Sequence, residues 1–438
     1  MQPFSRILIT STLTLAVWIP VLGFSAPAAG EFQLPTPGGP FTVGTRFLYW
    51  VDTGRPNQFT EEPDDFRAVS VQVWYPAESP TEGTPKSFND RSAAEFWVKS
   101  GLFTDAFVSE VAERPSHSFL DVPIDNSAPA FPLVIYSASG VMDANILLAE
   151  ELASQGYVVL ALGHPHWCAY YFDADGKISF RDQKGDNYNR KMWAEETAEG
   201  VNQIKEALTA AKTAAEKKSL QEALNQAMPT QVSDIHLWAQ DVGFVLDQLD
   251  LANRTDPFFK GRLDLEKVGV MGYSKGGAAA GETCLTEERC KAGVNLSGFM
   301  FGQIASRELT VPFMVMESIE PWCKDCLPIN DLLFHNSQSS IYMVQIGKAT
   351  HGNFTDLSAL KRYLSEGSQS LLGTIDGLRF LEIQNGYVRQ FFDRHLKGLP
   401  APLLDASSSP YEEVRFKSRH PQGVRRPEPP RTKTRQTG

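Results

Sequence analysis

Residues 268–280 read VGVMGYSKGGAAA. The first four are an apolar run typical of a buried strand, and the small residues from Gly276 onward are suited to open a closely packed helix. Between them, Gly272-Tyr-Ser-Lys-Gly276 has the form G-x-S-x-G, which places a serine in a sharp turn that only glycine neighbours fit. This strand–turn–helix context predicts that Ser274 is a nucleophile rather than a polar residue of an unrelated tight turn.

The segments around this motif predict a central sheet. Apolar runs at 131–136 and 157–162 are typical of buried strands, and a helix capped by Asp143 fits between them, ending before Gly156. Strand, helix and strand in this order imply parallel strands joined by right-handed crossovers. Further strands are predicted at 67–75, 267–271, 292–296, 311–316 and 341–345, and a closing helix at 377–397. The fold class is therefore α/β, with a mostly parallel central sheet and helices on both faces.

A helical insertion interrupts this order before the strand that leads to Ser274. It covers about residues 185–230, where Ala, Lys, Glu and Gln are frequent and the apolar periodicity is weak. Such a composition predicts one or two exposed helices. The composition fits two interpretations: a solvated insertion without a direct role, or a cap over the active site.

A serine hydroxyl is a weak nucleophile and needs a general base. Among the eight histidines, His351 follows the predicted strand at 341–345 and comes after Ser274 in the chain. That position fits the chain order serine, acid, histidine. His164 and His166 precede the serine, so they are interpreted as structural or substrate-facing residues.

The N-terminus has the features of an export signal. Arg6 gives a positive charge, residues 7–24 are apolar, and Ala26-Pro-Ala28 has the small-x-small form of a cleavage site. The alternative is an uncleaved membrane anchor, but Pro20 interrupts an apolar run that is barely long enough to span a bilayer. We expect residues 1–28 to be a cleaved signal peptide and the protein to be secreted or periplasmic.

The composition limits the class of partner. The 438 residues, 42% of them hydrophobic and 11% aromatic, are enough for a large core. The formal net charge of −11 argues against nucleic acid as a partner, because no broad positive field would attract phosphates. Residues 409–438 are the exception, since they are basic and rich in proline. They predict a disordered tail after a domain at 29–408, with weak contact to a membrane surface as the alternative.

The cysteines are compatible with an oxidising compartment. Cys284 and Cys290 are close enough in sequence to pair, as are Cys323 and Cys326, which would leave Cys168 free. A zinc site at Cys323-Lys-Asp-Cys326 is the alternative, but no second pair of ligands follows at a recognisable spacing. We therefore predict no metal and no cofactor, and no oligomeric state follows from the sequence.

Four segments carry a resemblance to a known family. They are Gly44-Thr-Arg with Val73-Trp-Tyr-Pro76, residues 152–158 (LASQGYV), residues 265–277 (LEKVGVMGYSKGG) and residues 293–301 (GVNLSGFMF). In combination, over most of 39–398, they resemble the platelet-activating-factor acetylhydrolases and their bacterial dienelactone-hydrolase-like relatives, which are α/β-hydrolases. The resemblance implies an α/β-hydrolase fold and a secreted, metal-free, lipase-like esterase in which Ser274 is the nucleophile and His351 the base.

The chain departs from this family at the third catalytic residue. Relatives carry an aspartate after the strand that follows the elbow, and this chain has Ser297 there. A serine lacks the charge that stabilises an imidazolium, and loss of that charge costs on the order of 10⁴ in turnover in serine proteases. Many α/β-hydrolases carry the acid after the next strand, where Glu320 is the first candidate and Glu317 the second. The alternative is that both are structural or surface carboxylates.

The oxyanion hole is expected to combine two backbone N–H groups. One belongs to Lys275, the residue after the nucleophile, and the other to the loop after the strand at 131–136, where Ser139 is the candidate.

By resemblance, the substrates are phospholipids with short or oxidised sn-2 acyl chains, cleaved through an acyl-serine intermediate. A general short-chain or polyester esterase is the first alternative. A catalytically impaired, lipid-binding relative is the second, because Ser297 replaces the acid.

Overall fold

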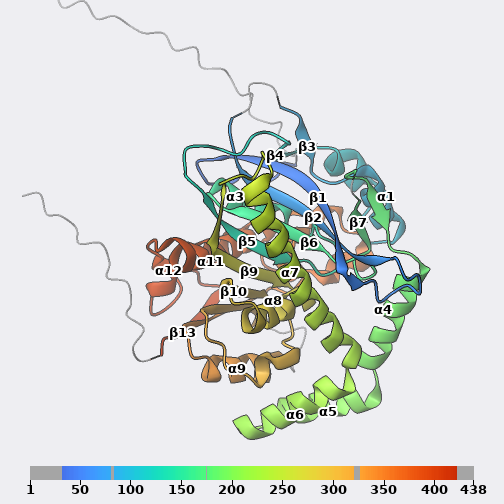
Figure 1. The fold of residues 1–438 in the computed structure, drawn as a ribbon. Coiled ribbons are helices and arrows are strands. Elements are labelled where there is room, and N and C mark those ends of the chain that lie inside the picture. Colours follow the sequence, from blue (N-terminus) through green and yellow to red (C-terminus); the bar gives the residue numbers. More distant parts are fainter. Residues whose placement is uncertain (1–31, 80–82, 174, 320–325, 422–438) are drawn as a thin grey trace, which may run out of the picture. The chain divides into compact units, whose positions relative to one another are not determined.

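The computed structural model describes residues 32–79, 83–173, 175–319 and 326–421 (Figure 1). The chain divides into two units, Met1–Gln33 and Leu34–Gly438, and the fold below is that of the second. The predicted signal peptide at 1–28 and the candidate acid Glu320 lie outside the described residues. Of the helices that the structure describes, none combines the length and apolar character needed to cross a membrane.

One large sheet organises the fold. Within the described ranges, eleven strands pair in the order β13-β12-β11-β10-β9-β5-β6-β2-β1-β4-β3. Their bounds are β1 Thr42–Pro56, β2 Phe66–Ala77, β3 Pro85–Ser87, β4 Pro115–Leu120, β5 Phe131–Ser137, β6 Val158–Gly163, β9 Leu263–Tyr273, β10 Cys290–Leu296, β11 Phe313–Ser318, β12 Ile341–Ile346 and β13 Val414–Arg419. A separate hairpin joins β7 (Tyr170–Phe172) to β8 (Ile178–Phe180).

The centre of the sheet is parallel, as the sequence predicts. β6, β5, β9, β10, β11 and β12 run in the same direction, while β2 and β13 flank them antiparallel. Every residue of β5 and β6 is buried, which explains their continuous apolar runs, because a parallel strand is covered on both faces. The carboxyl ends of these strands therefore meet at one edge, where sites of such sheets are found.

Helices cover both faces of this sheet. α7 (Pro229–Thr255) and α8 (Lys275–Thr286) contact β9, whereas α3 (Ile146–Ser154) contacts β6 and α11 (Gly377–Lys397) contacts β9 and β10. α3 and α11 also contact each other, and α7 contacts α8, so the two pairs form two layers. The remaining helices of the main body are α1 Arg91–Lys99, α2 Asp105–Phe107, α9 Cys326–Asn336, α10 Leu357–Leu360 and α12 Pro402–Asp405.

The predicted cap of α3 is wrong. α3 begins at Ile146 with Asn145 as its N-cap residue, and Asp143 lies before it. The Asp143 carboxylate instead accepts hydrogen bonds from Tyr170 and Asn89. A tertiary contact thus outweighs the local capping preference.

The insertion at 185–230 forms three helices rather than one or two. They are α4 (Gln183–Glu196), α5 (Glu199–Ala210) and α6 (Ala214–Ala227), and α5 and α6 lie at the lower edge of Figure 1 beyond α7. The break before α6 has a sequence cause, because Thr213 and Glu216 form a reciprocal capping box that starts a new helix.

Part of the predicted C-terminal tail is ordered. Val414–Arg419 forms β13, which pairs antiparallel with β12 at the edge of the sheet. Assigning residues 414–419 to a disordered tail is therefore wrong. The basic residues alternate with Val414 and Phe416, and the Phe416 ring stacks on Tyr387 at 5.7 Å. Such alternation is typical of an edge strand, where Arg and Lys also oppose pairing with other chains.

One of the two expected cysteine pairs is present. Cys284 at the end of α8 forms a disulfide with Cys290 at the start of β10, and Cys168 is a buried free thiol. The Cys323–Cys326 segment lies outside the residues whose side chains are described. Among the described residues, no group of His, Cys, Asp and Glu side chains is arranged to hold a metal ion.

Candidate active site

Ser274 lies in a strained turn between β9 and α8. Its φ and ψ angles are 55° and −125°, a conformation that L residues rarely adopt and that is found at functional sites. The two glycines of the motif make this turn sterically feasible. A Cβ atom on Gly272 would lie 2.1 Å from the Gly276 carbonyl oxygen, and one on Gly276 would lie 2.0 Å from the carbonyl oxygen of Ser137. The G-x-S-x-G pattern is therefore a packing requirement of the elbow.

His351 is placed to act on Ser274. It follows β12 at the start of a short 3₁₀ helix, and its Nε2 atom is 3.1 Å from Ser274 Oγ. The Tyr273 ring stacks on the imidazole with a centroid distance of 4.6 Å, which fixes the plane of the ring. Burial lowers the pKa of His351 to about 4, so the imidazole is neutral at neutral pH and is able to accept a proton.

Ser297 contacts the other imidazole nitrogen. Its Oγ atom is 3.0 Å from His351 Nδ1, and its backbone N–H donates to the Met316 carbonyl oxygen at 2.8 Å. The structure therefore places this serine beside the imidazole nitrogen that the third member of a catalytic triad contacts. A hydroxyl oxygen is able to accept the Nδ1–H and orient the ring, but it supplies no negative charge.

Glu317, the second candidate for the acid, belongs to a different polar cluster. Its carboxylate is 6% exposed and accepts hydrogen bonds from Asn330 at 2.5 Å and Gln345 at 2.7 Å. It lines a cavity together with Lys217 and Asp331, whereas Ser274 and His351 line another. The structure therefore does not bring Glu317 to the candidate nucleophile and base.

The two predicted oxyanion donors lie on the same cavity as the candidate nucleophile Ser274. Lys275 is the first residue of α8, where backbone N–H groups have no acceptor within the helix and are free to face a developing negative charge. Ser139 lies in the loop after β5 and lines the same cavity as Ser274. Both residues thus line the cavity in which an oxyanion on Ser274 would form, and their role as donors stays a prediction.

The side chain of Lys275 ties the elbow to the helices above it, a contact that the sequence did not reveal. Its Nζ atom is 2.6 Å from Asp234 of α7 and 3.0 Å from the Met192 sulfur of α4. The ammonium also lies 3.4 Å from the centre of the Trp167 ring, a cation–π distance. Burial lowers the pKa of Lys275 to about 8, although Asp234 opposes the shift.

The insertion covers the candidate site. The cavity that contains Ser274 and His351 has a volume of about 400 Å³. Part of its wall comes from the insertion and from the start of α7, through Met192, Trp193, Glu196, Lys205 and Gln231. This placement favours the interpretation of the insertion as a cap over that of a solvated appendage. In the sequence, the apolar pair Met192-Trp193 inside a polar helical segment is the signal that could have indicated a cap.

Comparisons with known proteins agree with this geometry. The family model described as "Platelet-activating factor acetylhydrolase, isoform II" matches residues 27–400. A probable 1-alkyl-2-acetylglycerophosphocholine esterase of Arthroderma benhamiae is 23% identical, over 93% of this chain and 99% of that protein. A platelet-activating factor acetylhydrolase of Cavia porcellus is 22% identical, over 84% of this chain and 79% of its own. Among solved structures, a ferulic acid esterase from Streptomyces cinnamoneus has a TM-score of 0.66 at 23% identity, covering 89% of this chain and 99% of that one.

Proposed function

Because the chain belongs to the platelet-activating factor acetylhydrolase family, isoform II, we propose that it releases short or oxidised sn-2 acyl chains from phospholipids. The family and the named activities of its relatives make it a carboxylic ester hydrolase with an α/β-hydrolase fold. The observation that carries the proposal is the contact between Ser274 Oγ and His351 Nε2 at 3.1 Å. This contact supports the proposal, because an imidazole beside the hydroxyl of an elbow serine is able to act as its general base.

The proposed reaction proceeds through an acyl-serine. His351 Nε2 takes the proton of Ser274 Oγ as the oxygen attacks the carbonyl carbon of the ester. The backbone N–H of Lys275 and a donor from the Ser139 loop stabilise the resulting oxyanion. The intermediate then collapses: the bond to the alcohol breaks, and the imidazolium returns the proton to the departing oxygen. A water molecule, deprotonated by His351, hydrolyses the acyl-serine by the same steps.

Acid inactivation is expected near pH 4 rather than near 6.5, the ordinary pKa of histidine. His351 accepts a proton only when it is neutral, and burial lowers its pKa to about 4. As the pH falls through that value, Nε2 becomes protonated and kcat/KM declines, whereas it should change little between about pH 5 and 7. The measurement is kcat/KM for p-nitrophenyl acetate against pH, with circular dichroism to verify folding. An inflection near 6.5 would contradict a site governed by burial alone, because a carboxylate beside the imidazole, as predicted for Glu320, raises the pKa of His351.

Short acyl chains are expected to be the best substrates. Each methylene that finds room contributes about 0.8 kcal/mol of burial, and a steric penalty follows once the room is filled. In the proposed enzyme, kcat/KM should therefore peak at acyl chains of roughly two to six carbons and fall steeply for long ones. The measurement uses a series of p-nitrophenyl esters and of sn-2-acyl phosphatidylcholines.

The same assays test the expected independence from metals. Serine hydrolysis requires no metal, so EDTA should leave the rates unchanged. A maximum at long-chain emulsified lipids would contradict the predicted pocket size, and loss of activity on chelation would contradict the proposed mechanism.

We also propose that the protein is exported and meets lipid at a surface. The signal-like residues 1–28 and the Cys284–Cys290 disulfide support export, since disulfides persist in oxidising compartments. Trp193 lines the catalytic cavity and is 55% exposed, and tryptophan favours membrane–water interfaces. Contact with a lipid surface is measured by cosedimentation with phosphatidylcholine vesicles, and Trp193→Ala should bind less than the native chain.

A further inference from the structure

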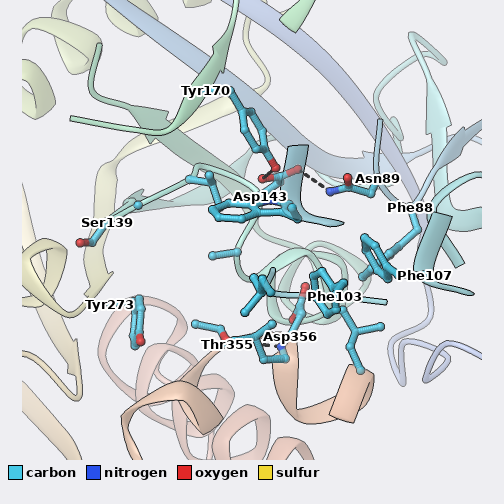
Figure 2. A pocket seen from close by; sticks show the side chains of 17 residues that line it. Phe88, Asn89, Phe103, Phe107, Ser139, Asp143, Tyr170, Tyr273, Thr355 and Asp356 are labelled. Atoms are coloured by element: carbon cyan, nitrogen blue, oxygen red, sulfur yellow. Dashed lines mark hydrogen bonds between the residues drawn. The ribbon is translucent and has the colours of Figure 1, made fainter. Parts of the chain in front are cut away.

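A second cavity adjoins the catalytic one (Figure 2). It has a volume of about 220 Å³, below the ~300–1,000 Å³ usual for drug-sized ligands, so it suits a small group. Ser139 and Gly140 line both cavities. Tyr273, which precedes the nucleophile and stacks on His351, also lines the second cavity. The second cavity is therefore in a position to take part of a substrate whose ester lies at Ser274.

The walls of this cavity are mostly aromatic. Phe88, Phe103, Phe107, Trp97 and Tyr170 contribute to it, from the loop before α1 through α2 and from β7. Phe103 and Phe107 stack at 4.0 Å and so form a rigid wall. Walls of this kind favour an apolar ligand body.

Two oxygen atoms in these walls have no hydrogen-bond partner among the described residues. They are Oδ1 of Asn89, a residue that is 7% exposed, and Oδ1 of Asp356, a residue that is 5% exposed. A buried acceptor without a donor costs about 1–3 kcal/mol, so such atoms call for an explanation.

Neighbouring contacts fix the orientation of both side chains. The Asn89 amide donates to Asp143 Oδ2 at 3.1 Å, and Tyr170 donates to Asp143 Oδ1 at 2.7 Å. Asp356 Oδ2 accepts from the Leu147 backbone N–H at 3.2 Å. In Figure 2, Asn89, Asp143 and Tyr170 lie on one side of the cavity, and Asp356 is separate from them. In each side chain, the other polar atom makes a hydrogen bond, and this bond fixes the position of the oxygen that has no partner.

The charges around the cavity favour a neutral donor over a cation. Burial raises the pKa of Asp356 well above its usual range, which favours the neutral acid. Because Oδ2 accepts from Leu147, the proton of this acid lies on Oδ1, which is then a hydrogen-bond donor. Burial also raises the pKa of Asp143, and the Lys86 ammonium opposes this shift. Lys86 therefore already provides a positive charge that attracts the Asp143 carboxylate. An added ammonium ion would meet little uncompensated negative charge here.

We propose that this cavity binds an uncharged, hydroxyl-bearing part of the ester substrate, with its apolar body against the aromatic walls and its hydroxyl donating to Oδ1 of Asn89 or accepting from the protonated Oδ1 of Asp356. This inference rests on the proposed function. It adds that the enzyme prefers substrates that carry a hydroxyl group away from the ester bond. The hydroxylated group belongs either to the acyl chain or to the alcohol, and substrates of both kinds distinguish the two.

The test compares esters that differ only by a terminal hydroxyl. The acyl pair is p-nitrophenyl hexanoate and p-nitrophenyl ω-hydroxyhexanoate, and the alcohol pair is hexyl acetate and ω-hydroxyhexyl acetate. A satisfied buried acceptor should raise kcat/KM roughly tenfold for the hydroxylated member of one pair. Equal values within both pairs would overturn the proposal, as would a larger gain for the corresponding ω-ammonium ester.

Two variants locate the effect. Asn89→Leu removes one free acceptor and should reduce the preference for the hydroxylated ester to near unity, while Ala144→Leu should weaken it by filling the cavity, whose wall Ala144 forms. The matched control is Asn126→Leu, because Asn126 is exposed and its amide also donates to a carboxylate, that of Glu78. A preference that survives in both cavity variants would contradict the site.

Binding without turnover separates this inference from the proposed function. Calorimetric titration of the Ser274→Ala protein with hexanediol and with hexanol measures the cavity directly. Roughly tenfold tighter binding of hexanediol would support the site even if no ester were hydrolysed. Equal binding of the two alcohols would overturn it even if all the esters were hydrolysed.

Discussion

Replacing Ser274 by alanine is expected to lower kcat for p-nitrophenyl acetate by roughly 10⁶-fold, a loss of the size seen when a catalytic serine is removed. The reason is that the acyl-serine no longer forms and His351 has no hydroxyl to deprotonate. Covalent labelling by a fluorophosphonate should disappear as well, because the reagent reports the nucleophile itself. The measurements are the steady-state rate and the labelled fraction.

The fold should survive this substitution. Alanine fits where serine does, and the strained φ of 55° is carried by a non-glycine residue in both proteins. Circular dichroism and thermal unfolding should therefore match those of the native chain. The matched control is Ser306→Ala, which changes an exposed serine and should leave activity and labelling unchanged. Labelling that persists in Ser274→Ala would show that the nucleophile is another residue, and absence of labelling in the native chain would favour a lipid-binding relative.

The parts of the site that sequence patterns reveal are those with local causes. The elbow can be predicted from the sequence because it requires glycine at 272 and 276. At both positions a backbone carbonyl oxygen lies too close to leave room for a Cβ atom. His351 is visible because it follows a strand that begins with the apolar run Ile341-Tyr-Met-Val344. Both residues, Ser274 and His351, follow the carboxyl end of a strand, and this position places them at the same edge of the sheet. The apolar pattern that locates the strands is therefore sufficient to predict where the two residues lie.

The parts that the sequence does not reveal depend on contacts between distant segments. Lys275 meets Asp234 only because α7 packs over α8, and nothing in the spacing of the two residues indicates an ion pair. Asp143 has the local pattern of a helix cap, yet Tyr170 from the β7 hairpin takes its carboxylate. The tail prediction failed at β13 because the charge of the segment concealed its alternation. Tertiary packing therefore decides these positions.

Ser297 lies where the third member of a catalytic triad would contact His351, and it supplies no charge there. Its hydroxyl lies 3.0 Å from His351 Nδ1 and orients the ring without a charge. The chain that leads to Glu320 runs beside the strand that leads to His351, because Ile319 of the segment after β11 donates to the Ile346 carbonyl oxygen of β12 at 2.9 Å. We predict that Glu320 supplies the missing charge, as in hydrolases that carry the acid after this strand.

Replacing Glu320 by glutamine is accordingly expected to lower kcat by about 10⁴-fold with little change in KM, because the imidazolium formed in the transition state loses its counter-charge while the substrate is still bound. Glu317→Gln is the matched control, since that carboxylate is held by Asn330 and Gln345, and it should cost far less. Ser297→Asp supplies the third comparison. In the native chain it should give little gain, but in Glu320→Gln it should restore part of the rate by placing a carboxylate beside His351 Nδ1. Equal, mild losses from the two glutamate variants, together with a large gain from Ser297→Asp alone, would show that the natural site works with the serine and without an acid.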